Sequence, residues 1–168
     1  MIYMHAYTYE IRAYIRMYVR MYVYAAIYGV ADKIDFVCGD FLELASGFCG
    51  KVDAVFLSPP WGGPDYSAAC VFDMSQMTVD GERLFRAARS ITDAIAMFLP
   101  RNVNVAQLVA LACLPSPVSR KNQDDTRSDS DGPGLACARG RAVEVEKNLV
   151  NSRLKAVTVY YGSLVRPL

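Results

Sequence analysis

The feature that most restricts the fold is a short, almost continuous apolar run at residues 52–58 (VDAVFLS), which stops at two consecutive prolines. An apolar run of this length, bounded by turn residues, is typical of a strand that is buried on both faces of a parallel sheet. Proline ends such a strand because it has no backbone N–H to donate to a neighbouring strand. The pattern therefore predicts an α/β fold in which one central strand ends at Ser58.

The rest of the chain alternates between strand-like and helix-like patterns. Further β-rich runs, expected to be strands, occupy residues 34–38, 94–99, 142–150 and 154–162. Helical spacing of apolar residues predicts helices at 80–93, where Asp80 is a candidate N-cap, and at 103–113. A polar turn separates the last two runs, which predicts an antiparallel hairpin at the C-terminal end of a mostly parallel sheet.

Composition excludes several classes of protein. The 168 residues suit one domain, and 18 Lys and Arg against 17 Asp and Glu leave a net charge of +1. Such a balance excludes a protein that coats nucleic-acid backbone with a basic surface, but it allows a small basic pocket. There is no apolar stretch of 18 residues, so we expect no membrane span. The five cysteines include no C-x-x-C pair, which indicates neither a metal site nor a disulfide framework and favours a reducing compartment.

Two segments depart from this α/β texture. Eight of the 11 tyrosines lie within the first 28 residues, and residues 11–22 read IRAYIRMYVRMY, which fits a helix with a basic face or, better, an alternating strand. We interpret residues 1–25 as a low-complexity Tyr/Arg repeat without selected function; the alternative is a basic amphipathic surface for RNA or membrane headgroups. Residues 119–131 hold seven charges and no apolar side chain, which predicts a disordered insertion at about 114–140.

The residues after the central strand, 58–66 (SPPWGGPDY), carry the clearest chemical signal. Ligands of open α/β sheets bind beyond the carboxyl ends of the strands. Two prolines make a rigid turn that presents carbonyl acceptors, which together with the Ser58 hydroxyl suit an amine such as that of a nucleobase. Trp61, the only tryptophan, offers a flat face on which a base can stack. A cationic base would stack more tightly still.

These residues also carry a family resemblance. The strings at 35–41 (DFVCGDF) and 56–66 (FLSPPWGGPDY) resemble the trimethylguanosine synthase family, as do shorter matches at 28–33, 98–102 and 144–161. The resemblance covers residues 26–113 and 143–166. It implies a class I S-adenosylmethionine-dependent methyltransferase (Rossmann-like) fold. It also implies methylation of the guanine 2-amino group of 7-methylguanosine-capped RNA.

The resemblance further implies roles for individual residues. Ser58, Pro59 and Trp61 would form the catalytic turn that holds the amine, and Trp61 would stack on the methylated guanine. Tyr66, Arg101 and Asn102 would bind the rest of the cap, where an Arg suits phosphate because its planar fork donates two parallel bonds. Asp40 and Phe41 would bind the adenine of S-adenosyl-L-methionine; the alternative for Asp40 is a helix cap. His5 lies in the repeat and is interpreted as incidental.

One part of the family pattern has no counterpart in this sequence. The family begins with a strand, a Gly-rich turn (G-x-G) and a second strand that ends in an acidic residue, and nothing similar occurs before Ala26. We therefore expect a methyltransferase domain over residues 26–168 that misses its first strands and has impaired activity. Two other readings stay open. One is a non-catalytic cap-binding remnant; the other is an enzyme resembling DNA amino-methyltransferases.

The resemblance also implies the setting in which the protein works. The expected partners are capped small nuclear and nucleolar RNAs, with neither DNA nor membrane as a partner and with the chain as a monomer. The expected location is the nucleus, in the nucleolus or nuclear bodies, with the cytoplasm as a second compartment.

Overall fold

A computed structural model describes residues 2–5, 11–48, 51–63, 66, 68–115 and 142–166. For residues 2–5, 11–18 and Cys38 only the backbone is described. The insertion expected at about 114–140 therefore lies almost entirely outside the described residues. The chain divides into two compact units, Met1–Leu44 and Ala45–Leu168, which are described separately below.

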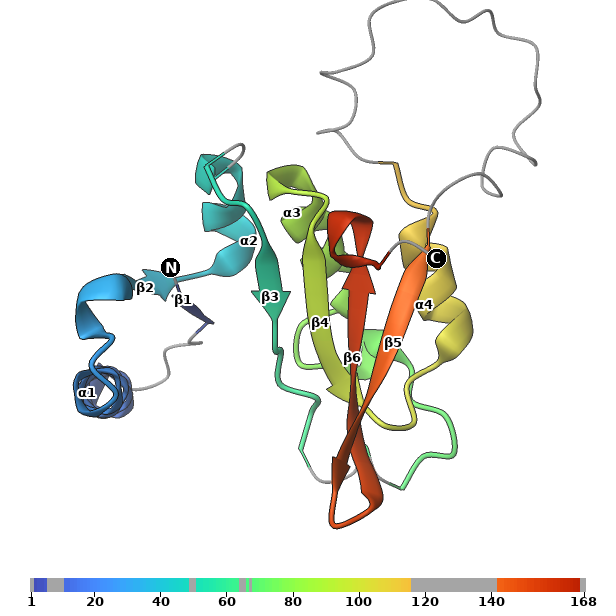
Figure 1. The fold of residues 1–168 in the computed structure, drawn as a ribbon, viewed down its shortest axis with the longest axis horizontal. Coiled ribbons are helices and arrows are strands. Elements are labelled where there is room, and N and C mark those ends of the chain that lie inside the picture. Colours follow the sequence, from blue (N-terminus) through green and yellow to red (C-terminus); the bar gives the residue numbers. More distant parts are fainter. Residues whose placement is uncertain are drawn as a thin grey trace, which may run out of the picture. The chain divides into compact units, whose positions relative to one another are not determined.

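The first unit is a strand–helix–strand arrangement (Figure 1). Strand β1 (Ile2–His5) pairs in parallel with β2 (Phe36–Gly39), and the connection contains helix α1 (Ile11–Ile27) and a 3₁₀ turn, η1 (Ala31–Lys33). A short helix, α2 (Phe41–Leu44), follows β2. Helix α1 ends near Gly29, whose φ of +67° is the left-handed conformation that commonly terminates helices.

The Tyr/Arg repeat is thus helical. The alternating-strand interpretation of residues 11–22 is wrong, and the helical one is confirmed. A helix satisfies its own backbone hydrogen bonds, whereas a strand needs a partner along its length. The alternation of residue types was therefore not enough to predict a strand at residues 11–22. The expectation that the first strands are missing is corrected in part, because one strand, β1, precedes β2, although the sequence has no Gly-rich turn before β2. The compositional boundary at residue 25 falls inside α1.

The second unit is built on a four-stranded sheet in the order β3-β4-β6-β5. Its strands are β3 (Val55–Leu57), β4 (Ile95–Pro100), β5 (Val143–Val150) and β6 (Arg153–Tyr161). Strands β3 and β4 are parallel, and β6 is antiparallel to both β4 and β5, so the predicted C-terminal hairpin is confirmed. Helices α3 (Gly81–Ile91) and α4 (Val105–Ala112) pack against β3 and β5, respectively. The described residues of the unit also form 3₁₀ turns: η2 (Ala45–Phe48), η4 (Met74–Gln76) and η7 (Gly162–Leu164).

The core of the second unit lies between the sheet and helix α3. The helix begins as predicted, because the Asp80 carboxylate accepts a hydrogen bond from the Arg83 N–H at 2.9 Å. Helical spacing predicts an apolar face of Leu84, Ala87, Ala88 and Ile91; all of these are buried except Ala87, which is half-buried. Phe85 is fully buried as well and packs edge to face on Tyr161 of β6, with ring centroids 4.7 Å apart.

Strand β3 is less buried than the apolar run predicted. Leu57 is buried, but Phe56 is 62% exposed. The strand lies at one end of the four-stranded sheet, and alternation places Phe56 on the face opposite Val55 and Leu57. Burial on both faces, which the apolar run indicated, is therefore wrong for the described part of this unit.

Candidate functional site

The predicted amine-holding turn and the predicted phosphate-binding residues lie at the same end of the sheet. Residues 58–61 follow β3 directly, and Arg101 and Asn102 follow β4. Because β3 and β4 are parallel neighbours, with Leu57 paired to Met97, their carboxyl ends meet at one edge. The fold therefore brings together the catalytic and substrate-binding residues that the sequence singled out in this unit.

Trp61 is anchored to the neighbouring strand. Its indole Nε1–H donates to the Phe98 carbonyl oxygen at 3.2 Å, and the indole stacks against the Phe98 ring with centroids 5.4 Å apart and an interplanar angle of 30°. Trp61 remains partly exposed. A buried Trp usually needs a partner for its N–H, and a main-chain carbonyl of β4 provides it here.

Tyr66 extends this packing into an aromatic cluster that consists of Trp61, Tyr66, Phe72 and Phe98. The Tyr66 ring meets Trp61 edge to face at 5.0 Å and Phe72 edge to face at 6.4 Å. Phe72 is almost fully buried and fixes the cluster to the core. Sequence reasoning missed Phe72 and the supporting role of Phe98; the signal for Phe98 was its place in the matching string at 98–102.

The two glycines after Trp61 are required by backbone conformation. Gly62 and Gly63 both have a φ of +94°, which L-residues with a side chain rarely adopt. A Cβ on Gly62 would also lie 3.3 Å from the Gln76 carbonyl oxygen. The turn that carries Trp61 therefore depends on both glycines.

Asn102 faces the protein. Its side-chain Nδ2 donates to the carbonyl oxygens of Tyr66, at 2.9 Å, and Ala69, at 2.8 Å. Its Oδ1 is buried and has no hydrogen-bond partner among the described residues. The resemblance implied a substrate contact, but both amide hydrogens are already used within the site.

Unlike Asn102, Ser58 and Arg101 are exposed to solvent. Pro59 between Ser58 and the second proline is partly exposed. Arg101 forms no ion pair with a described residue. A hydroxyl and a guanidinium at the carboxyl ends of neighbouring strands are thus accessible to a ligand.

Asp40 and Phe41, the predicted adenine-binding pair, belong to the first unit. The Asp40 Oδ1 accepts from the Leu42 N–H at 2.8 Å, and its carbonyl oxygen accepts from the N–H groups of Glu43 and Leu44. The helix cap that the sequence left open as an alternative is therefore present. Phe41 is buried. A capping carboxylate can still accept further hydrogen bonds, so the cap does not exclude a ligand contact.

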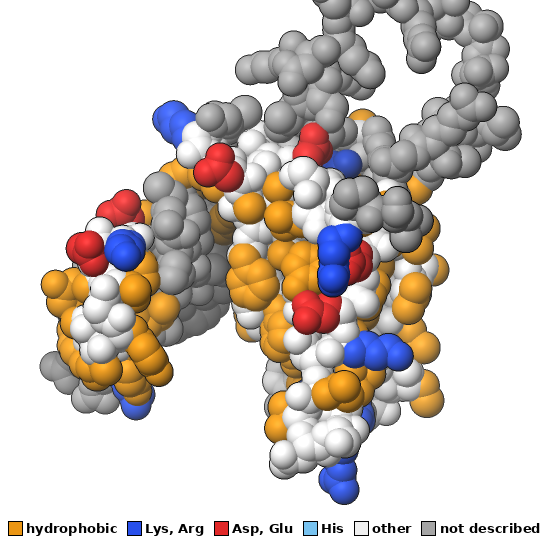
Figure 2. Space-filling model, viewed as in Figure 1, with side chains coloured by type: hydrophobic (Ala, Val, Ile, Leu, Met, Phe, Trp, Pro, Cys, Tyr) orange, Lys and Arg blue, Asp and Glu red, His pale blue; other side chains and the backbone are white. Residues whose placement is uncertain are grey.

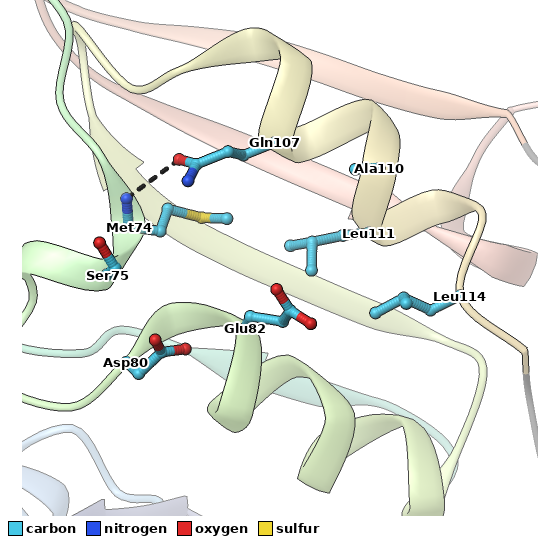
Figure 3. A pocket seen from close by; sticks show the side chains of 8 residues that line it. All are labelled: Met74, Ser75, Asp80, Glu82, Gln107, Ala110, Leu111 and Leu114. Carbon is cyan, nitrogen blue, oxygen red and sulfur yellow. Dashed lines mark hydrogen bonds between the residues drawn. The ribbon is translucent and has the colours of Figure 1, made fainter.

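A cavity of about 190 Å³ lies in the second unit, between η4, the start of α3 and α4 (Figure 3). None of its lining residues is a predicted site residue: Met74, Ser75, Asp80, Glu82, Gln107, Ala110, Leu111 and Leu114. Gln107 bridges its rim, accepting from the Met74 N–H at 3.0 Å and donating to Asp73 at 2.9 Å. Hydrogen bonds from Ser75 and Gln107 lower the pKa of Asp73 below its ordinary value. The cavity is thus separate from the site at the strand ends.

Other kinds of site find little support in the described part of the chain. No group of three or more His, Cys, Asp or Glu is placed there to hold a metal ion. None of the described helices has the length and apolarity needed to cross a membrane. Cys70 is a free, exposed thiol, and Cys113 is disulfide-bonded, which the cysteine spacing did not predict.

Comparison with known proteins gives a family and two relatives. A family model described as RNA cap guanine-N2 methyltransferase matches residues 3–164. The trimethylguanosine synthase of Schizosaccharomyces pombe is 37% identical over 89 residues, which are 50% of this chain and 37% of that protein. That of Saccharomyces cerevisiae is 36% identical over 86 residues, 48% of this chain and 27% of the relative. The matched part is thus about a third of the first relative and about a quarter of the second.

Proposed function

The chain belongs to the RNA cap guanine-N2 methyltransferase family, and from that premise we propose that its second unit binds a 7-methylguanosine RNA cap and presents the guanine 2-amino group for methylation. The observation that carries this proposal is the position of Trp61. Its indole is fixed against Phe98 directly after the Ser58-Pro59 turn, so a guanine stacked on it would lie beside that turn. Stacking on an aromatic side chain contributes about 1–3 kcal/mol per base.

Ser58 and the turn carbonyls would act by orientation. The 2-amino group has two N–H donors, and acceptors at the end of β3 would hold both, leaving the nitrogen lone pair directed at the methyl donor. Fixing the geometry in this way can supply several kcal/mol of the barrier reduction. The proton would leave after attack, when the nitrogen is cationic and acidic, so no residue needs to act as a strong base.

Tyr66 and Arg101 would bind the phosphates and ribose of the cap. Tyr66 adjoins Trp61, and Arg101 is exposed at the end of the neighbouring strand. On the face shown in Figure 2, basic and acidic side chains of the described residues are interspersed over the sheet. Local recognition of one cap needs only a few charges, which agrees with the net charge of +1.

The residues present fit the methyl donor only in part. S-adenosyl-L-methionine would supply the electrophilic methyl group, and Asp40 with Phe41 would hold its adenine. In Rossmann-like units the turn after the first strand is Gly-rich, so that the backbone can approach the ligand closely. Here residues 1–28, which include β1 and α1, contain no glycine. These residues do not fit the methionine and ribose half, and we therefore propose that the methyl-transfer activity of this chain is impaired.

The relatives are named trimethylguanosine synthases, which supports a more specific proposal for substrates and location. We propose 7-methylguanosine-capped small nuclear and nucleolar RNAs as substrates and the nucleus, including the nucleolus and nuclear bodies, as the location. We propose that the chain acts as a monomer.

Fluorescence of the single tryptophan tests the proposed function directly. We expect 7-methylguanosine triphosphate to quench Trp61 emission at concentrations at least about tenfold lower than GTP does, because the methylated base is cationic and stacks more strongly. Polarization of a labelled cap analogue provides a second readout that survives Trp61→Ala, and this variant should lose binding. Equal affinity for methylated and unmethylated ligands would contradict cap recognition.

The absence of glycine between β1 and α1 favours a second candidate, a cap-binding protein without turnover. It predicts cap binding with no transfer of labelled methyl groups to capped RNA, whereas the primary proposal predicts slow transfer. The third reading, a DNA amino-methyltransferase, predicts transfer to a DNA oligonucleotide instead. One assay with both nucleic acids separates the three.

A further inference from the structure

We propose that Asn102 is a positioning residue that holds Tyr66 and Arg101 in register with Trp61, so that guanine stacking and phosphate binding act on the same cap. This inference rests on the proposed function and adds a role for a residue that the resemblance placed in contact with substrate. It predicts that Asn102 controls affinity for the phosphates of the cap more than affinity for its base.

The amide of Asn102 joins two points of the loop that follows the catalytic turn. Its Nδ2 donates one hydrogen to the Tyr66 carbonyl and the other to the Ala69 carbonyl. Both acceptors are carbonyl oxygens, so the amide orientation is settled: with the oxygen and nitrogen exchanged, three oxygens would face one another. The buried Oδ1 has no described partner, so the side chain is held through its N–H groups.

The main chain around Asn102 fixes the far end of the same loop. The Phe72 N–H donates to the Asn102 carbonyl oxygen at 2.7 Å, and the Asn104 N–H donates to the Phe72 carbonyl oxygen at 2.9 Å. These bonds form a parallel bridge between Phe72 and Val103, both of which are buried. The loop from Tyr66 to Phe72 is therefore tied to the end of β4 at both of its ends and near its middle.

This arrangement links the residue that would stack on the guanine to the residues that would bind the phosphates of the cap. Tyr66 packs edge to face on Trp61, so the Asn102 bond to its carbonyl sets where its ring and hydroxyl lie relative to the indole. Arg101 immediately precedes Asn102 and is exposed. A displacement of Asn102 would move Tyr66 and Arg101 relative to each other, while Trp61 would keep its own bond to Phe98.

The test compares two ligands in Asn102→Ala and its isosteric companion Asn102→Asp, which has no amide hydrogens. We expect 7-methylguanosine triphosphate to bind about tenfold more weakly, equivalent to about 1.4 kcal/mol. The nucleoside 7-methylguanosine should bind within about twofold of the wild type, since stacking on Trp61 is retained. Asn104→Ala is the matched control: its side chain caps α4 by accepting from the Ala106 N–H at 3.0 Å and makes no hydrogen bond to the described residues of the loop. It should lower the melting temperature but leave both affinities unchanged.

A double-mutant cycle separates positioning from general loosening. If Asn102 acts through Arg101, Asn102→Ala should weaken triphosphate binding little further in an Arg101→Ala background. Full additivity would overturn the proposal, as would equal weakening of nucleoside and triphosphate binding or no effect at all.

A measurement on the wild-type chain covers the case in which both Asn102 variants fail to fold. The Asn102 side-chain amide resonances should shift on addition of the triphosphate and much less on addition of the nucleoside; equal shifts would overturn the proposal. If the wild-type chain bound neither ligand, the proposed function itself would fail, and this inference with it.

Discussion

Trp61 is held from several sides before any ligand arrives. The bond from Nε1 to the Phe98 carbonyl contributes about 0.5–1.5 kcal/mol. Each aromatic contact, with Phe98 and with Tyr66, adds about as much again beyond its buried area. A side chain fixed in this way loses little conformational entropy when a base stacks on it. The anchoring would therefore favour the proposed base stacking as well as stability.

Phe98→Leu tests this role of the aromatic packing. The change removes the ring beneath the indole but keeps the main-chain acceptor for Nε1, so we expect cap-analogue affinity to fall about threefold to tenfold as Trp61 loses its fixed orientation. Titration of Trp61 fluorescence measures the effect. Phe56→Leu is the matched control, because the Phe56 side chain is 62% exposed. Similar losses in both variants would argue against a specific role for Phe98.

Arg101→Lys tests whether recognition of phosphate depends on a guanidinium. Lysine keeps the charge but cannot donate two parallel hydrogen bonds, so we expect weaker binding of 7-methylguanosine triphosphate, by about fivefold, with nucleoside binding unchanged. Arg153→Lys, at the exposed start of β6, should change neither affinity. A loss that is equal for nucleoside and triphosphate would place Arg101 outside the phosphate site.

What the sequence predicts at this scale depends on how far apart the interacting residues lie. Trp61 and Ser58 stand out because a single contiguous string identifies them. The role of Asn102 could not be predicted, since its acceptors are main-chain carbonyls 36 and 33 residues away, and any residue type supplies a carbonyl. Phe98 belongs to the matching string at 98–102, but that string does not show that its ring packs on Trp61.

At the scale of secondary-structure elements, local patterns predicted well wherever one element provides its own signal. The cap at Asp80, the apolar face of α3 and the two runs of the hairpin are such cases. Strand β3 is different, because its burial depends on which neighbours the rest of the chain supplies. The repeat in α1 shows the same limit: alternating and helical spacing coexist at residues 11–22, and only tertiary context decides between them.

The junction between β6 and η7 depends on one glycine. Gly162 has a φ of +63°, and a Cβ there would collide with the Asp93 carbonyl oxygen and carbon. We expect Gly162→Ala to lower the free energy of unfolding by about 1–3 kcal/mol or more, because strain and overlap act together. Gly47→Ala is the control, since its Cβ would meet nothing within 4 Å and no positive φ is involved. Chemical denaturation of both variants decides, and equal stabilities would contradict the described junction.

At the scale of the whole molecule, Tyr161 joins three elements of the second unit. It lies fully buried in β6, packs on Phe85 of α3, and donates its hydroxyl to the Leu108 carbonyl of α4 at 3.3 Å. Burial raises the pKa of Tyr161 well above its ordinary value of 10, although the nearby Arg89 charge opposes this. Above pH 10 the unfolded chain loses this proton and the folded chain keeps it, so the stability contributed by Tyr161 is complete below pH 10 and declines as the pH rises further.

We therefore expect the melting temperature of the chain to fall above pH 10 and Tyr161→Phe to make that fall shallower. Phenylalanine keeps the ring packing and has no proton to lose. Tyr160→Phe is the comparison, because Tyr160 lies at the surface and its pKa is raised mainly by its hydrogen bond to Glu146, so its removal should change the alkaline limb less. If the melting temperatures of the wild type and Tyr161→Phe fell equally above pH 10, Tyr161 would not contribute to the loss of stability.

The proposed site for S-adenosyl-L-methionine has an adenine half and a half for ribose and methionine. The sequence provides candidate residues for the first half only. We propose that Asp40 and Phe41 hold the adenine, whereas residues 1–28 contain no glycine that would allow a close approach to ribose or methionine. We therefore expect S-adenosylhomocysteine to bind no more tightly than adenosine, with dissociation constants of about 1 mM or weaker, when both are measured by isothermal titration.

Asp40→Ser separates the two roles of Asp40. Serine can still cap α2, as the Asp40 Oδ1 does through the Leu42 N–H, but it is too short to reach the adenine amine as well. This variant should keep its helix content and lose the residual adenosine binding. Micromolar affinity for S-adenosylhomocysteine in the wild type would show that residues elsewhere in the chain supply the missing half, and would remove the physical reason for impaired methyl transfer.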